Sequence, residues 1–271
     1  MEKLPRRKFL HLAAGAAALP TVSRTASAQV ADAPRVVRVG CPPFASPLAS
    51  LPGATPENYS TFDPSLMQGA VIDLYKAMAN DARFQIRFFV FVGGQLPGAL
   101  ASDKIDTLYA AHSAANAAVM NISEPIFADS EVLITNKGDT TPYETYADLK
   151  GQVVGSRTGT IYEEDMKKNG LEVKSYLTAP ELFNAVNTGE VKVAINTRYI
   201  PTAYALLGGQ FPNVHIVKSY QSKFSDAVGI ATRKDRIGLF ELINVSLAKL
   251  KSEGTVRTIF AKYGIADALA K

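Results

Sequence analysis

The chain has 271 residues, 47% of them hydrophobic, which is enough to bury a sizeable core in one large domain or two lobes. Its formal charge of +4 comes from the first 28 residues, and without them basic and acidic side chains are equal in number, so we expect neither nucleic acid nor an anionic membrane as a partner. The single cysteine, Cys41, excludes an intrachain disulfide and a cysteine-based zinc cluster, and we expect no cofactor and no metal.

The first 28 residues have the order of parts found in an export signal. Arg6-Arg7 is a twin-arginine pair, and residues 10–19 form an apolar run that is shorter than the roughly 20 residues a membrane span needs. Ala26-Ser27-Ala28 is a small-residue cleavage site. We therefore expect a protein that is exported to the periplasm and cleaved after Ala28; a retained N-terminal anchor is the alternative.

Predicted strands and helices alternate along the rest of the chain. β-Branched and apolar runs predict strands over residues 35–40, 84–92, 105–110, 131–136, 152–156, 173–176, 191–195, 214–217 and 227–232. Apolar residues at helical spacing predict helices over residues 69–79, 96–101, 161–169, 179–187, 200–207, 239–252 and 255–263. Such alternation predicts a doubly wound α/β fold with parallel strands and with ligands at the carboxyl ends of the strands. The run 84–92 is apolar enough that we expect it to be buried on both faces.

The stretch from residue 105 to 127 contains a first candidate for a binding site. Its predicted strand ends in the small-residue turn Ala111-His112-Ser113, and an alanine-rich helix follows until Ser123-Glu124-Pro125 stops it. Unpaired N–H groups at a helix start can hold a polar ligand, so Ala111 and Ser113 are candidates. The alternative is an ordinary strand-to-helix turn.

A second strand-to-helix turn has a clearer cap. Thr160 is placed to cap the helix at 161–169, and Gly170 is placed to end it. Gly159, Thr160 and the next backbone N–H therefore form a predicted anion site at the helix start.

Several short motifs follow one another in an order that can be compared with known families. They are PPF at 42–44, GAVIDL at 69–74, LPGALASDKID at 96–106, ISEP at 122–125, DLKG at 148–151 with Gly159-Thr160 after it, and the segment 254–264. In this order they resemble the family 3 periplasmic solute-binding proteins, the polar-amino-acid receptors of ABC transporters. The resemblance covers residues 35–264.

The resemblance implies a periplasmic-binding-protein type II fold, in which two doubly wound lobes are joined by a two-strand hinge. Residues 29–130 and 224–271 would form the first lobe and residues 131–223 the second. A small-molecule ligand would be trapped as the lobes close. The implied partners are this ligand and an ABC permease, and the implied state is a monomer without enzymatic activity.

The residues that hold α-amino acids in this family are not kept here. Relatives grip the carboxylate with an arginine a few residues after the first turn, where this chain has Asn116 or a neighbouring alanine. They hold the ammonium with an aspartate after a second-lobe strand, where this chain has Thr197, preceded by Asn196. Gly93-Gly94 replaces an aromatic wall. We therefore expect a small polar solute that is not a standard α-amino acid.

Other residues at matched positions are candidates for ligand contacts. Phe44 either stacks on the ligand or belongs to the core, and Tyr109 flanks the first turn. Arg157 and Arg198 lie beside matched positions of the second lobe, where either supplies the missing cation or is a surface arginine. The loop 45–68 is either a lid over the cleft or an unstructured insert.

Two further functions stay open. Loss of the amino-acid contacts is compatible with an accessory protein that docks on a periplasmic dehydrogenase of the quinoprotein type. Some relatives are cyclohexadienyl dehydratases, but we find no carboxylate–histidine or carboxylate–lysine pair at matching positions to act as general acid and base.

Overall fold

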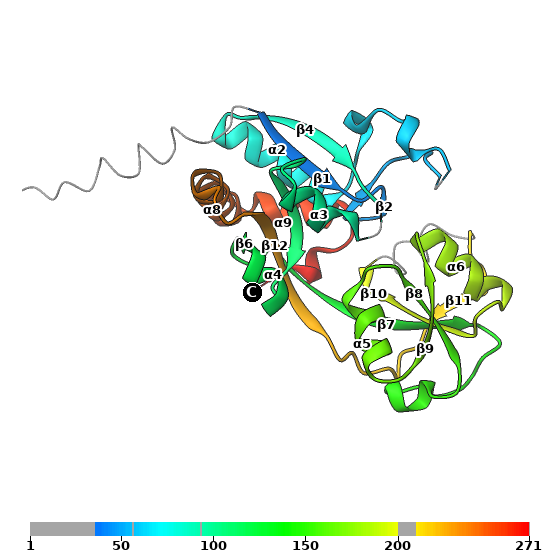
Figure 1. The fold of residues 1–271 in the computed structure, drawn as a ribbon. Helices are drawn as coiled ribbons and strands as arrows, with labels where there is room; N and C mark the ends of the chain where they lie inside the picture. Colours follow the sequence, from blue (N-terminus) through cyan, green and yellow to red (C-terminus); the bar gives the residue numbers. More distant parts are fainter. Residues whose placement is uncertain (1–35, 56, 93, 200–209, 271) are drawn as a thin grey trace, which may run out of the picture.

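The computed structural model describes residues 36–55, 57–92, 94–199 and 210–270, which fold into two α/β lobes (Figure 1). The predicted export signal and the predicted helix at 200–207 lie outside the described residues. In the part of the chain that is described, no helix is both long and apolar enough to cross a membrane.

The first lobe is built on a sheet with the strand order β4-β1-β5-β12. Strand β1 (Val36–Cys41) pairs in parallel with β4 (Gln85–Val90) and β5 (Thr107–Ala111), and β12 (Ser225–Arg233) pairs with β5 in antiparallel sense. Because β4 is the edge strand, Phe88 is its one buried residue, and the expectation of a strand buried on both faces is wrong.

Three helices pack against one another on the first lobe: α2 (Ala70–Ala82), α8 (Ile237–Ser252) and α9 (Thr255–Lys262). In α2 the apolar residues at helical spacing, Val71, Leu74, Tyr75 and Met78, are all fully buried in one cluster with the inner residues of β1. The predicted amphipathic helices of this lobe are thus confirmed, and their burial stabilises the platform on which the cleft is built.

The second lobe has a sheet of its own, on which β8 (Val153–Arg157) pairs in parallel with β9 (Glu172–Tyr176) and β10 (Val193–Thr197). Strand β7 (Phe127–Asn136) runs antiparallel to β10 and to β11 (Val214–Ile216). Helices α5 (Ile161–Lys168) and α6 (Ala179–Thr188) connect the parallel strands, and the side chains of Thr178 and Glu181 cap α6 reciprocally.

Strand β7 runs from the first lobe into the second, and β12 begins where the chain returns to the first lobe (Figure 1). They pair in antiparallel register, with Ser130 opposite Ser225 and Phe127 opposite Val228, where the chain passes from one lobe to the other. This is the two-strand hinge of a type II fold. The prediction of parallel strands holds for the other long strands and is wrong for β7, β11 and β12, because the chain crosses between lobes and returns.

A buried carboxylate holds the second crossover in place. Glu131 is 1% exposed and accepts hydrogen bonds from the backbone N–H groups of Lys223 and Phe224. It also accepts bonds from the hydroxyls of Tyr220 at 3.3 Å and Ser222 at 2.6 Å. One acidic side chain on β7 therefore satisfies four donors of the returning segment.

The described part of residues 45–68 is folded. The alternative that this loop is an unstructured insert is therefore wrong for the described residues. A small hairpin, β2 (Phe44–Ala45) with β3 (Ala49–Ser50), is followed by the 3₁₀ turns η1 (Tyr59–Thr61) and η2 (Pro64–Leu66). Leu48 and Met67 are buried in the first-lobe core, whereas Ala45 packs with the second-lobe cluster around α6. The hairpin therefore touches both lobes.

The remaining short elements are α3 (Gln95–Ala101), α4 (Ala114–Val119), β6 (Met120–Ile122), η3 (Tyr146–Leu149) and η4 (Ala266–Ala268).

Candidate functional site

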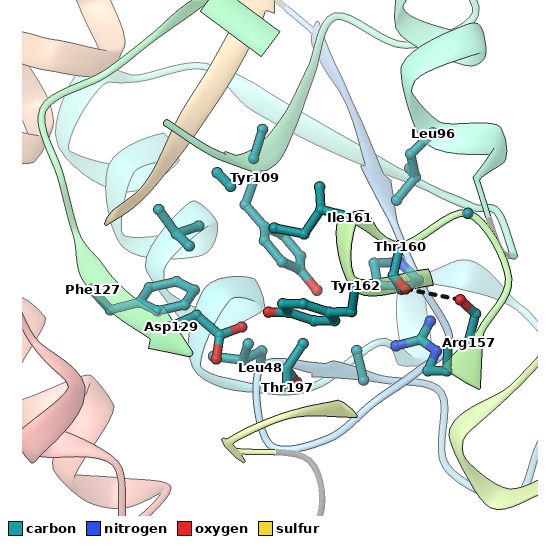
Figure 2. Close-up of a pocket in the computed structure, with 16 residues that line it drawn as sticks. Leu48, Leu96, Tyr109, Phe127, Asp129, Arg157, Thr160, Ile161, Tyr162 and Thr197 are labelled. Atoms are coloured by element: carbon teal, nitrogen blue, oxygen red, sulfur yellow. Dashed lines mark hydrogen bonds between the residues drawn. The ribbon is translucent and has the colours of Figure 1, made fainter. Parts of the chain in front are cut away.

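A cavity of about 260 Å³ lies between the two lobes, and sixteen residues line it (Figure 2). Pro42 follows β1, Ala111 ends β5, Arg157 ends β8 and Thr197 ends β10. The cavity therefore lies at the carboxyl ends of parallel strands from both sheets, as the predicted α/β alternation implies.

The first lobe contributes an apolar wall to the cavity. Leu48 comes from the hairpin, Leu96 from α3, Tyr109 from β5 and Phe127 from the start of β7, and Val228 of β12 lies beside them. Burial raises the pKa of Tyr109, so its hydroxyl stays neutral at physiological pH. This wall suits the apolar part of a solute.

Polar groups reach the cavity from the second lobe and from the crossover. Arg157 and Thr160 lie at the β8–α5 turn, Thr197 lies at the end of β10, and Asp129 lies on β7 where it crosses between lobes. Tyr162 of α5 is 6% exposed, and Phe224 holds its ring edge-on at 5.6 Å between centroids. In Figure 2, Asp129 and Arg157 lie on opposite sides of the Tyr162 ring.

The turn at Gly159 and Thr160 already holds a carboxylate from its own helix. The Gly159 N–H donates to Glu163 at 2.6 Å, the Glu163 N–H donates to the Thr160 hydroxyl, and that hydroxyl donates to the Arg157 carbonyl at 2.9 Å. This corrects the predicted anion site at Gly159. Glu163 lies in the first turn of α5, so its side chain can fold back to the start of the helix. The Gly159 N–H is therefore already occupied by an intramolecular acceptor.

Glu163 is 6% exposed and is surrounded by donors. Lys167 lies 2.6 Å from its carboxylate, and the Ser175 hydroxyl donates to it as well. Burial alone would raise the pKa of Glu163, but the hydrogen bonds from Lys167, Ser175 and Gly159 outweigh burial and lower it. The ionised side chain therefore fixes the turn that presents Thr160 to the cavity.

We expect Glu163→Gln to lower the free energy of unfolding by about 2 kcal/mol at neutral pH, because it weakens charged hydrogen bonds in a buried place. Since the folded-state pKa lies below the ordinary value of 4.5, this contribution is present above that pH and is lost as pH falls through the folded-state pKa. Urea unfolding of both proteins across this range measures it. The exposed neighbour Glu164→Gln is the control, and a loss that does not change with pH would contradict the account.

Six of the eleven residues proposed from sequence line this cavity, and five do not. Those in the lining are Tyr109, Ala111, Arg157, Gly159, Thr160 and Thr197. Those outside it are Phe44, Ser113, Asn116, Asn196 and Arg198.

Local contacts account for three of the residues outside the lining. Ser113 caps α4 by accepting a bond from the Asn116 N–H, and the Asn116 amide donates to the Ala111 carbonyl at 2.9 Å. Phe44 is 7% exposed and packs edge-on against the Tyr59 ring, which is the core position that its alternative described. These side chains serve the fold around the cavity.

The two second-lobe arginines differ in position. Arg198 is exposed, and its backbone N–H donates to the Ser130 carbonyl of the crossover. Arg157 is partly buried, and its guanidinium points into the cavity (Figure 2). The structure thus brings Arg157, and not Arg198, to the place where a ligand would lie.

Thr197 has an unused hydroxyl at the cavity. Within the described part of the chain, the Thr197 Oγ1 and Asn196 Nδ2 atoms are buried and have no hydrogen-bond partner. Since buried polar groups in proteins are nearly always satisfied, the Thr197 hydroxyl is placed to bond a ligand.

Sequence reasoning missed Asp129, Tyr162 and Phe127. Asp129 had a signal, because it is an acidic residue inside a largely apolar strand at the expected crossover. Tyr162 had a weaker signal, its place in the first turn of a helix that starts at the cleft.

As for metals, the described ranges contain no group of three or more His, Cys, Asp or Glu side chains suited to hold one.

Two lobes, a two-strand hinge and a cavity between the lobes define a type II periplasmic binding protein. Solved structures agree. An ancestral arginine-binding protein bound to arginine superposes with a TM-score of 0.73 at 26% identity, over 85% of this chain and 98% of that one.

The family model for bacterial extracellular solute-binding proteins, family 3, matches residues 49–266, and the chain belongs to this family. The ABC transporter arginine-binding protein 1 of Escherichia coli is 26% identical over 70% of this chain and 79% of its own length. The histidine-binding periplasmic protein of Salmonella typhimurium is 24% identical over 88% of this chain and 91% of its own.

Proposed function

We propose that this protein is a periplasmic solute receptor of an ABC transporter, which captures one small solute between its lobes without chemical change. The observation that supports this proposal most strongly is the cavity at the lobe interface. Arg157, Thr197 and Asp129 line it together with the apolar wall of the first lobe. The family and the periplasmic relatives support the same role.

We propose the lobe boundaries at residues 130/131 and 223/224, with the first lobe formed by 29–130 and 224–271. The pairing of Ser130 with Ser225 on the crossing strands supports this division. Closure would bring the β8–α5 turn toward α3, and an added Cβ on Gly94 of the first lobe would already lie 3.5 Å from the Gly159 Cα of the second. The receptor is proposed to act as a monomer after cleavage of its export signal.

We propose further that the solute is not a standard polar α-amino acid. The described part of the cavity lining contains no arginine from the first lobe, and Thr197 offers a neutral hydroxyl where an ammonium would need a charge. Arginine, glutamine and glutamate are therefore expected to leave the melting temperature unchanged.

A thermal-shift screen of the purified protein against small metabolites tests both statements. A matching solute should raise the melting temperature by about 3 °C or more, because it binds only the folded state. A clear rise with one of the three amino acids would contradict the ligand class. No rise with any solute, together with co-purification of a periplasmic dehydrogenase, would favour the accessory role instead.

A further inference from the structure

The charges that line the cavity are of opposite sign and lie apart. Arg157 ends β8 in the second lobe, Asp129 lies on the β7 crossover, and the Tyr162 ring lies between them (Figure 2). Among the described residues that line the cavity, no other side chain is an Asp, Glu, Lys or Arg. The net charge of these lining residues is thus zero, with the positive charge on one side of the cavity and the negative charge on the other.

A ligand that fits this pattern has two separated charges. The planar guanidinium of Arg157 matches a carboxylate in bidentate geometry, and the carboxylate of Asp129 matches an ammonium. Charged groups of a ligand in a closed, poorly solvated site are stable only when each has an opposite partner. An α-amino acid carries both charges on one carbon, so it cannot place them on opposite sides of Tyr162.

The space between the charges favours a short hydrocarbon chain. The Tyr162 ring lies there, and Tyr109, Phe127 and Leu48 supply apolar surface around it. A cavity of about 260 Å³ limits the ligand to a few carbon atoms. A dicarboxylate would bring its second charge to Asp129, and a phosphate would meet the Glu163 carboxylate that already takes the Gly159 N–H.

We propose, building on the role as a solute receptor, that the ligand is a small ω-amino acid. Its carboxylate binds Arg157, its ammonium binds Asp129, and its methylene groups lie on Tyr162 and Tyr109. The Thr197 hydroxyl donates a further bond to the ligand carboxylate.

Calorimetric titration with pairs of isomers tests this assignment on the wild-type protein. γ-Aminobutyric acid is compared with α-aminobutyric acid, and δ-aminovaleric acid with norvaline, so that only the position of the amine changes. We expect the better ω-isomer to bind on the order of 100-fold more tightly than its α-isomer, because only the former satisfies both charges. Equal or tighter binding of the α-isomers would overturn the proposal.

Two charge-removing variants test the contacts separately. Asp129→Asn and Arg157→Gln should each weaken binding of the ω-amino acid about 100-fold. The exposed Asp235→Asn and Arg87→Gln are matched controls that should leave it unchanged, and thermal unfolding without ligand verifies that each variant folds. Unchanged affinity in both cavity variants would contradict the assignment. Tight binding of some other small solute would overturn the ligand class and leave the receptor role standing, whereas binding of no solute would overturn both.

Discussion

Replacing Glu131 with alanine is expected to lower the free energy of unfolding by about 3 kcal/mol, the largest effect on stability that we predict. The carboxylate is fully buried and accepts bonds from Tyr220, Ser222 and two backbone N–H groups of the returning crossover. Its removal breaks these hydrogen bonds and leaves the donors of Tyr220, Lys223 and Phe224 without the acceptor that holds the crossover against β7. Urea unfolding of the purified variant measures the loss.

The exposed Glu172→Ala, on the edge strand β9, is the matched control for this measurement. It should change the free energy of unfolding by no more than about 0.5 kcal/mol. If Glu131→Ala is no more destabilising than this control, the carboxylate does not hold the crossover.

Tryptophan in place of Gly94 is expected to weaken solute binding by about 100-fold while leaving the protein folded. A Cβ at this position would lie 3.5 Å from the Gly159 Cα across the cleft, so a methyl group fits and an indole does not. The backbone at Gly94 (φ −76°) accepts any residue, so the substitution causes no local strain. The indole therefore obstructs the closed arrangement of the lobes, and the ligand loses the contacts that only this arrangement provides.

Gly94→Ala is the control, because its methyl group makes an ordinary van der Waals contact. Titration calorimetry with the best solute from the thermal-shift screen compares the two variants with the wild type. If the tryptophan variant binds as tightly as the alanine variant, solute capture does not require this approach of the lobes.

Much of the fold could be predicted because it depends on local patterns. The burial of Val71, Leu74, Tyr75 and Met78 follows from their helical spacing, and Thr160 caps α5 as its position indicates. The antiparallel crossing of β7 and β12 could not be read from either strand alone, since pairing between strands so far apart in the chain is not encoded in local periodicity. The order of family motifs implied two crossovers between the lobes, but not that these strands pair in antiparallel sense.

The candidate site was predicted less completely, for a physical reason. Strand ends predict the edge where a ligand binds, and Tyr109, Arg157 and Thr197, which were proposed on this basis, line the cavity. Whether a polar side chain at that edge points to the ligand or to its own backbone depends on competition among nearby donors and acceptors. The Ser113 hydroxyl accepts a bond from the Asn116 N–H, and the Glu163 carboxylate accepts one from the Gly159 N–H. In each case the donor and the acceptor lie within about one helical turn of each other.

We expect the two lobes to close on a small solute. Small-angle X-ray scattering of the wild-type protein, with and without the solute that stabilises it most, tests this closure most directly. We expect the radius of gyration to fall when that solute is added and to stay constant with arginine, glutamine or glutamate. A radius of gyration that no stabilising solute changes would contradict capture by closure of the lobes.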